Sequence, residues 1–103
     1  DSITKGGVRY KVTSAAADAF SGCKKLKEVT IGKNIKTIGK NCFKNCHSLK
    51  KINIRSKIFR KAGKNSLKGT NKKLIVSCNK KKMTKYKKLL KNRGNNKYKM
   101  KEK

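Results

Sequence analysis

Acidic residues are scarce in this chain of 103 residues, which has four Asp and Glu against 32 Lys and Arg, and a single histidine. The four carboxylates are widely separated in the sequence: Asp1, Asp18, Glu28 and Glu102. No acid/base pair can therefore be proposed. A dyad of Cys46 and His47 would require adjacent side chains to converge, which they seldom do. The sequence predicts a protein that is not an enzyme and uses no cofactor.

Long apolar segments are also missing. No run approaches the roughly 20 apolar residues that cross a bilayer, so the sequence predicts no membrane span. The amino end lacks the hydrophobic stretch of a signal peptide, and an export signal would have to lie upstream in a longer precursor. Hydrophobic residues make up only 34% of the chain, so the one small domain that this length allows needs a thin or stacked core.

Positive charge dominates what is present. The formal net charge of +28 predicts that anionic molecules bind to the chain or condense on it. Only four of the basic residues are arginines, and the other 28 are lysines. Lysine is a hydrated point charge without the guanidinium fork that reads phosphate or guanine bidentately. The charge therefore favours nonspecific attraction to polyanions over recognition of a nucleotide sequence.

A repeat with a fixed period, equal to the step from Phe20 to Phe43, organises the chain. The segment 20–31 is echoed in register by the segment 43–54, with Phe, Cys, Leu and two β-branched residues in the same places. The connecting segment 35–43 corresponds to 59–67 after one inserted residue near Ile58, and 12–20 is a degenerate upstream copy. The chain thus holds two full repeats, a half repeat before them and a modified repeat after them.

Each repeat alternates apolar and polar residues over the length of a short strand with one buried face. The residues predicted to point inward are Leu26, Val29 and Ile31, and then Leu49, Ile52 and Ile54. Those predicted to point outward are Glu28, Thr30, Lys51 and Asn53. The Gly-Lys-Asn-x-Phe stretch predicts about one turn of helix, with Phe20, Phe43 and Leu67 filling the interior. No coil can bury its apolar side alone, so the coils must stack as a mainly β repeat solenoid.

The repeat resembles the BspA-type leucine-rich repeats of bacterial and protozoan surface proteins. The resemblance rests on Ala19-Phe20-Ser-Gly-Cys23-x-x-Leu26-x-x-Val29-x-Ile31, followed by Ile35-x-x-Ile38-Gly-Lys-Asn41. It implies a stack of short parallel strands joined by short helical turns, in a single domain over residues 1–103, with repeats at about 8–78. Two departures stand out: Asn79 where the family often has proline, and Cys42 where alanine is usual.

The tail is similar to the usual ending of this family, a cap over about 79–103. Three residues of a final repeat strand alternate inward: Leu74, Val76 and Cys78. A lysine-rich stretch then leads into Tyr86-Lys-Lys-Leu-Leu, and helical spacing predicts a short helix over Lys80–Lys91 that lies on the open end of the stack. Gly94 is expected to end this helix, and Tyr98–Lys101 to add a last strand.

The cysteines leave three alternatives open. Cys23 and Cys46 occupy equivalent places in successive coils, about 5 Å apart, which is within reach of a disulfide. Reduced, buried thiols that act as small hydrophobes are the favoured interpretation. A zinc site built from Cys42, Cys46, His47 and Cys78 would have suitable ligand chemistry but poor spacing, so no metal site is predicted.

Two functional hypotheses follow. The family resemblance implies a cell-surface or secreted adhesion protein that binds host or matrix proteins, and geometry places its contacts at Glu28, Thr30, Lys51 and Asn53. The charge suggests instead an anchor that binds teichoic acid, sulfated glycans or, without sequence specificity, nucleic acid. Its expected residues form a continuous basic surface: Lys50, Lys72, Lys73, Lys80, Lys81, Lys82, Lys85, Lys87, Lys88 and Lys91. A plain alternative is a structural spacer whose lysines only keep it in solution.

Overall fold

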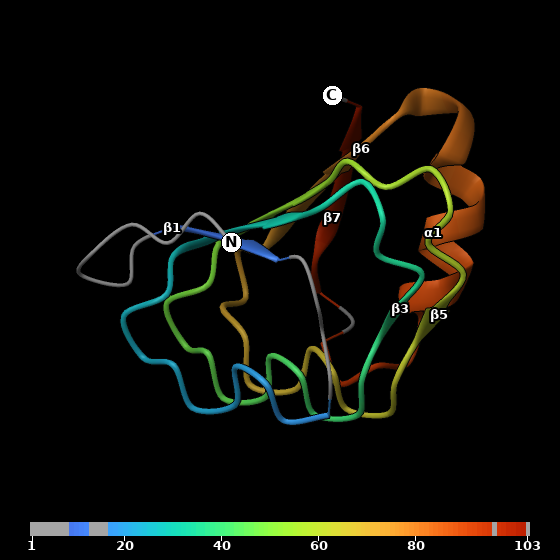
Figure 1. Ribbon diagram of the computed structural model, residues 1–103. Helices are drawn as coiled ribbons and strands as arrows, with labels where there is room; N and C mark the ends of the chain where they lie inside the picture. The colour runs from blue at the N-terminus through green and yellow to red at the C-terminus, as the bar shows by residue number, and fades with distance from the viewer. Residues whose placement is uncertain (1–8, 13–16, 96, 103) are drawn as a thin grey trace.

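One parallel sheet runs the length of the protein. The computed structural model describes residues 9–12, 17–95 and 97–102 (Figure 1). The strands are β1 (Arg9–Val12), β2 (Glu28–Ile31), β4 (Lys51–Ile54), β6 (Ile75–Cys78) and β7 (Lys99–Glu102). Their order in the sheet is β1-β2-β4-β6-β7, which is also their order in the chain, and every pair is parallel. Since parallel neighbours need a return connection, the chain makes one coil between successive strands.

The register of the sheet reproduces the repeat found in the sequence. Glu28 pairs with Lys51, the same step along the chain as from Phe20 to Phe43. Lys51 pairs with Ile75, which lies one position farther along than that step. The single inserted residue predicted near Ile58 accounts for this difference. On the return path, β3 (Thr37–Ile38) and β5 (Lys61–Ala62) form a second, two-stranded parallel sheet at the other side of the coils, close to the helix (Figure 1).

The core lies inside the coils and is filled by the residues predicted to point inward. Val29, Ile52 and Val76 are aligned across three strands, and each has at most 2% of its surface exposed. Phe20 and Phe43 stack in successive coils with ring centroids 5.5 Å apart and planes inclined by 10°. Leu67 occupies the equivalent place in the third coil and is completely buried, so the predicted interior residues of the described coils are confirmed.

The predicted helical turns between the strands are wrong. The Gly-Lys-Asn-x-Phe stretches are turns without a helix, because alternate backbone amides donate to the next coil: Phe20 to Cys42 (2.9 Å) and Phe43 to Ser66 (3.0 Å). Amides used in this way cannot form the i to i−4 bonds of a helix. The path also needs positive φ at Asn41 (59°), a value that Asn tolerates better than most residues.

Gly63 shows how closely successive coils approach. Its amide donates to the carbonyl of Ile38 at 2.7 Å, and a Cβ at this position would collide with the backbone of Gly39 and Lys40 in the preceding coil. Only a residue without a side chain fits there. The glycine of the repeat is therefore a packing requirement of the stack.

The tail forms a helix and a strand, as predicted. A 3₁₀ turn, η1 (Lys80–Lys82), leads into α1 (Met83–Leu90), and β7 begins one residue later than expected. At the position where the family often has proline, the Asn79 side chain accepts a hydrogen bond from the Lys81 amide at 2.9 Å. The role predicted for Gly94 is wrong, because α1 already ends at Leu90. A side chain at Gly94 would instead collide with the backbone of Lys68.

Helix α1 is held to the stack by a buried tyrosine. Tyr86 is fully buried, its ring meets that of Phe59 edge-on at 5.3 Å, and its hydroxyl donates to the carbonyl of Ser56 at 2.6 Å. Leu90, one turn later, is also buried, and α1 contacts both β5 and β7. The helix therefore packs on the end of the coil that contains β5.

Replacing Tyr86 by phenylalanine should lower the free energy of unfolding by about 1–3 kcal/mol, since the buried Ser56 carbonyl loses its partner. Urea unfolding of the full chain measures this change. Tyr98→Phe is the control, because its hydroxyl makes only an exposed 3.4 Å bond to Lys87 and should cost less than about 0.5 kcal/mol. Equal effects of the two substitutions would contradict the role given to Tyr86.

Candidate functional site

The outer face of the parallel sheet gathers side chains from four successive coils. Alternation along each strand directs one set of residues inward and the other outward. The outward set, called the strand face below, consists of Glu28, Thr30, Lys51, Asn53, Ile75, Ser77, Lys99 and Lys101. The register arranges it in two rows, Glu28-Lys51-Ile75-Lys99 and Thr30-Asn53-Ser77-Lys101. The four contact residues predicted from the sequence thus lie together in the first two columns of these rows.

Asn53 is more buried than expected for a side chain that points outward. Only 9% of its surface is exposed, and its Nδ2 donates to Oε2 of Glu28 at 3.0 Å. This bond joins the two rows and holds the half-buried carboxylate of Glu28 in place. Asn53 therefore serves to position Glu28, while Lys51 and Thr30 offer more of their own surface.

A hollow of about 520 Å³ opens on the strand face beside these residues. Its lining adds residues that the sequence analysis did not single out: Ile75, Ser77, Lys101 and Glu102. Ile75 is one of two large hydrophobic side chains exposed in the described part of the chain, at 38%. The predicted inward alternation of Leu74, Val76 and Cys78 already implied that Ile75 and Ser77 point outward. The strand face is therefore polar and basic with an apolar centre.

The ten lysines expected to form one basic surface divide into two groups. Lys50, Lys72 and Lys73 lie just before β4 and β6, at the beginning of these strands. The other seven lie on η1 and α1 or directly after them, beyond the end of β6. Along the chain, the four residues of β6, about 13 Å of strand, lie between the two groups. All ten are exposed except Lys82, which is half-buried.

The cysteines are free thiols in the structure, as in the favoured interpretation, and the alternative disulfide between Cys23 and Cys46 is not formed. Cys42, Cys46 and Cys78 are completely buried, and the Cys46 thiol donates to the carbonyl oxygen of Phe20 at 3.0 Å. For the zinc alternative, the described residues contain no group of three or more His, Cys, Asp or Glu placed to hold a metal ion. The exposed His47 side chain diverges from buried Cys46.

Burial raises the pKa of two of these thiols far above the ordinary value of 9.0. The pKa of Cys42 rises to about 12, first because burial removes the thiolate from water and second because Cys46 is close by. The pKa of Cys46 rises to about 11, again mainly through burial. A thiol with so high a pKa stays protonated at neutral pH and is a poor nucleophile, and these buried cysteines act as core residues.

The repeat motif of these coils is that of a known family. Residues 2–96 match the model of a family described as BspA type Leucine rich repeat region (6 copies). The chain belongs to the BspA-type leucine-rich repeat family. No curated protein and no solved structure matches the chain. Proteins of this family are generally non-enzymatic interaction modules, typically at the cell surface or secreted. Among the described residues of this member, no helix is both long and apolar enough to cross a bilayer.

The raised pKa of Cys42 predicts a specific loss of stability at high pH. Because folding favours the protonated thiol, its contribution is complete below pH 9 and is lost as the pH rises towards 12, by on the order of 1 kcal/mol per pH unit. The wild-type chain should therefore lose more stability between pH 8 and pH 11 than Cys42→Ala does, measured by urea unfolding. Lysine titration affects both proteins and cancels in the difference. An equal loss in the two proteins would show that the thiol titrates normally.

Proposed function

We propose that this chain is a non-enzymatic adhesion module of a cell-surface or secreted leucine-rich repeat protein, and that it binds a protein ligand through the strand face. Host and matrix proteins are the expected ligands. Residues 1–103 would act as a single domain, with repeats at about 8–78 and a cap at about 79–103. Family membership supports the class of function. One observation supports the strand face as the binding site: the exposed apolar Ile75 lies within a polar and basic hollow.

The composition of the strand face suits recognition of a protein. Interfaces have apolar centres surrounded by polar rims, and here Ile75 lies between Lys51 and Lys99 in one row and beside Ser77 in the next. Glu28 adds a carboxylate to an otherwise basic surface. A site for a bare polyanion gains nothing from a carboxylate such as Glu28 or from an apolar centre such as Ile75, so this mixture favours a protein ligand.

The size of the face suggests that the coils are part of a longer array. The four strands that carry the strand face, at about 4.8 Å spacing, and four residues at about 3.3 Å give a flat area of roughly 14 by 13 Å, or about 180 Å². A stable interface buries about 800 Å² on each partner. We therefore infer that the module is one end of a repeat solenoid, whose further coils extend the same face.

Substitution of Ile75 by serine tests the strand face without changing any charge. Binding of the full chain to a panel of matrix proteins, such as collagen, laminin and fibronectin, is measured by surface plasmon resonance at physiological salt. For any protein that binds, Ile75→Ser should weaken the affinity about tenfold or more, as removal of a central apolar contact does. Ile58→Ser is the matched control, since Ile58 is equally apolar, 44% exposed and outside the strand face. Equal losses for both variants would contradict the assignment.

A polyanion anchor remains the second candidate, favoured by the two exposed lysine groups. This function predicts binding to heparin, teichoic acid or duplex DNA that survives physiological salt and is selective for one of them. Binding that disappears between low and physiological salt is counterion release from a nonspecific basic surface. Ile75→Ser should leave polyanion binding unchanged, so the same variant separates the two candidates.

A further inference from the structure

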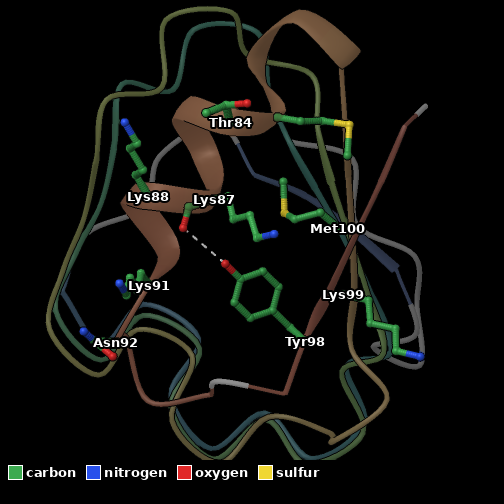
Figure 2. Close-up of a pocket in the computed structure, with 9 residues that line it drawn as sticks. Thr84, Lys87, Lys88, Lys91, Asn92, Tyr98, Lys99 and Met100 are labelled. Carbon is green, nitrogen blue, oxygen red and sulfur yellow. Dashed lines mark hydrogen bonds between the residues drawn. The ribbon is translucent and has the colours of Figure 1, made fainter.

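A second groove lies between α1 and β7, with a volume of about 950 Å³ (Figure 2). Tyr98, which directly precedes β7, and Met100 of β7 extend towards the helix and line the groove on one side, and Thr84 and Lys87 line it on the other. Of the residues of the strand face, Lys99 alone lines this groove.

The floor of the groove is apolar and well supported. Met83, Tyr98 and Met100 are half-buried and pack against the hydrophobic core. The Tyr98 hydroxyl donates to the carbonyl oxygen of Lys87 at 3.4 Å, which links the strand to the helix (Figure 2). Burial raises the pKa of Tyr98, so this phenol is a neutral donor at physiological pH. Three adjacent apolar side chains remain partly open to solvent in this space.

An unpaired strand edge forms one wall of the groove. Strand β7 is the last strand of the sheet, and no described strand pairs with its other side. The Lys99 amide donates to the carbonyl of Leu74 at 3.0 Å, towards β6. Because backbone groups alternate along a strand, the amide and carbonyl of Met100 point away from β6. The same alternation applies to Glu102, so the edge of β7 offers two donors and two acceptors for an added strand.

The positive charge around the groove determines which kind of peptide could pair with the edge of β7. Lys87, Lys88 and Lys91 from the helix and Lys99 from the strand line the groove, and Lys101 lies on the outer side of β7. Edge lysines are a common means of preventing strands of identical chains from pairing, and a net charge of +28 repels a second copy of this chain. An extended segment with carboxylates meets no such barrier.

We propose that the groove between α1 and β7 binds an extended acidic peptide, which pairs with the edge of β7 as a sixth strand. Alternation along the bound segment directs one set of its side chains onto Tyr98 and Met100 and the other set beside Lys99 and Lys101. The ligand therefore alternates apolar and acidic residues. This site borders the last column of the strand face, Lys99 and Lys101, and needs no further coils.

Titration of the full chain with a synthetic peptide of alternating glutamate and valine, nine residues long, tests the proposal at physiological salt. Binding should slow hydrogen exchange of the Met100 amide about tenfold or more, while the Lys99 amide, already bonded to β6, changes little. A peptide of alternating lysine and valine should not bind. Binding of the acidic peptide without protection of Met100 would reduce the effect to charge attraction and overturn the proposal.

Two charge reversals in the same row of the sheet locate the site. Lys99→Glu should weaken binding of the glutamate-valine peptide about tenfold or more, whereas Lys51→Glu, two strands away, should change it less than about threefold. Both variants change the net charge equally. Equal losses would indicate general attraction and contradict the groove. Because Ile75→Ser lies outside the groove, it should leave peptide binding intact, so this test can fail or succeed independently of the adhesion function.

Discussion

Backbone hydrogen bonds between successive coils are the interaction on which the rest of this protein depends. They run on the sheet side, where each strand pairs with its predecessor and its successor, and also through the turns, where Phe20 and Phe43 donate to the next coil. Bonds on two sides of the coil fix the spacing between neighbours. This spacing stacks the two phenylalanine rings at 5.5 Å and leaves no room for a side chain at Gly63. The core is therefore built in layers and needs few apolar residues.

The same constraint explains how a chain with 32 basic residues remains compact. Each coil places its apolar residues inside and leaves the rest of its surface to polar groups, so the exposed lysines are spread over the outer side of the coils. Where the stack ends, this arrangement is interrupted. Helix α1 closes part of the end through Tyr86 and Leu90, while Met83, Tyr98 and Met100 remain half-open. The partly exposed apolar side chains therefore lie where the repeat changes. These places are the coil that contains the inserted residue and β7, the last strand of the sheet.

Much of the fold was predictable from the sequence because a constant repeat length puts equivalent residues in register. The inward residues, the inserted residue near Ile58, the helix and the final strand follow from periodicity and from the family resemblance. The helical turns could not be predicted correctly from a local pattern. The Phe43 amide donates to the carbonyl of Ser66 in the next coil and is therefore not available for a hydrogen bond within a helix. Burial of Asn53 depends in the same way on a neighbouring coil, because its side chain bonds to Glu28 of the preceding strand. The groove beside β7 forms only where α1 and β7 pack together at the end of the stack, so no local sequence pattern predicts it.

The direction of the inter-coil bonds has a mechanical consequence. In a parallel stack these bonds point along the stacking axis, so tension applied along that axis pulls on every interface between coils, and the weakest interface yields first. The coils would then peel apart in sequence, and a coil such as the one from Glu28 to Lys51 would release roughly 80 Å of chain at about 3.5 Å per residue. A stack that yields in this way lengthens in steps and dissipates work before the whole chain has unfolded.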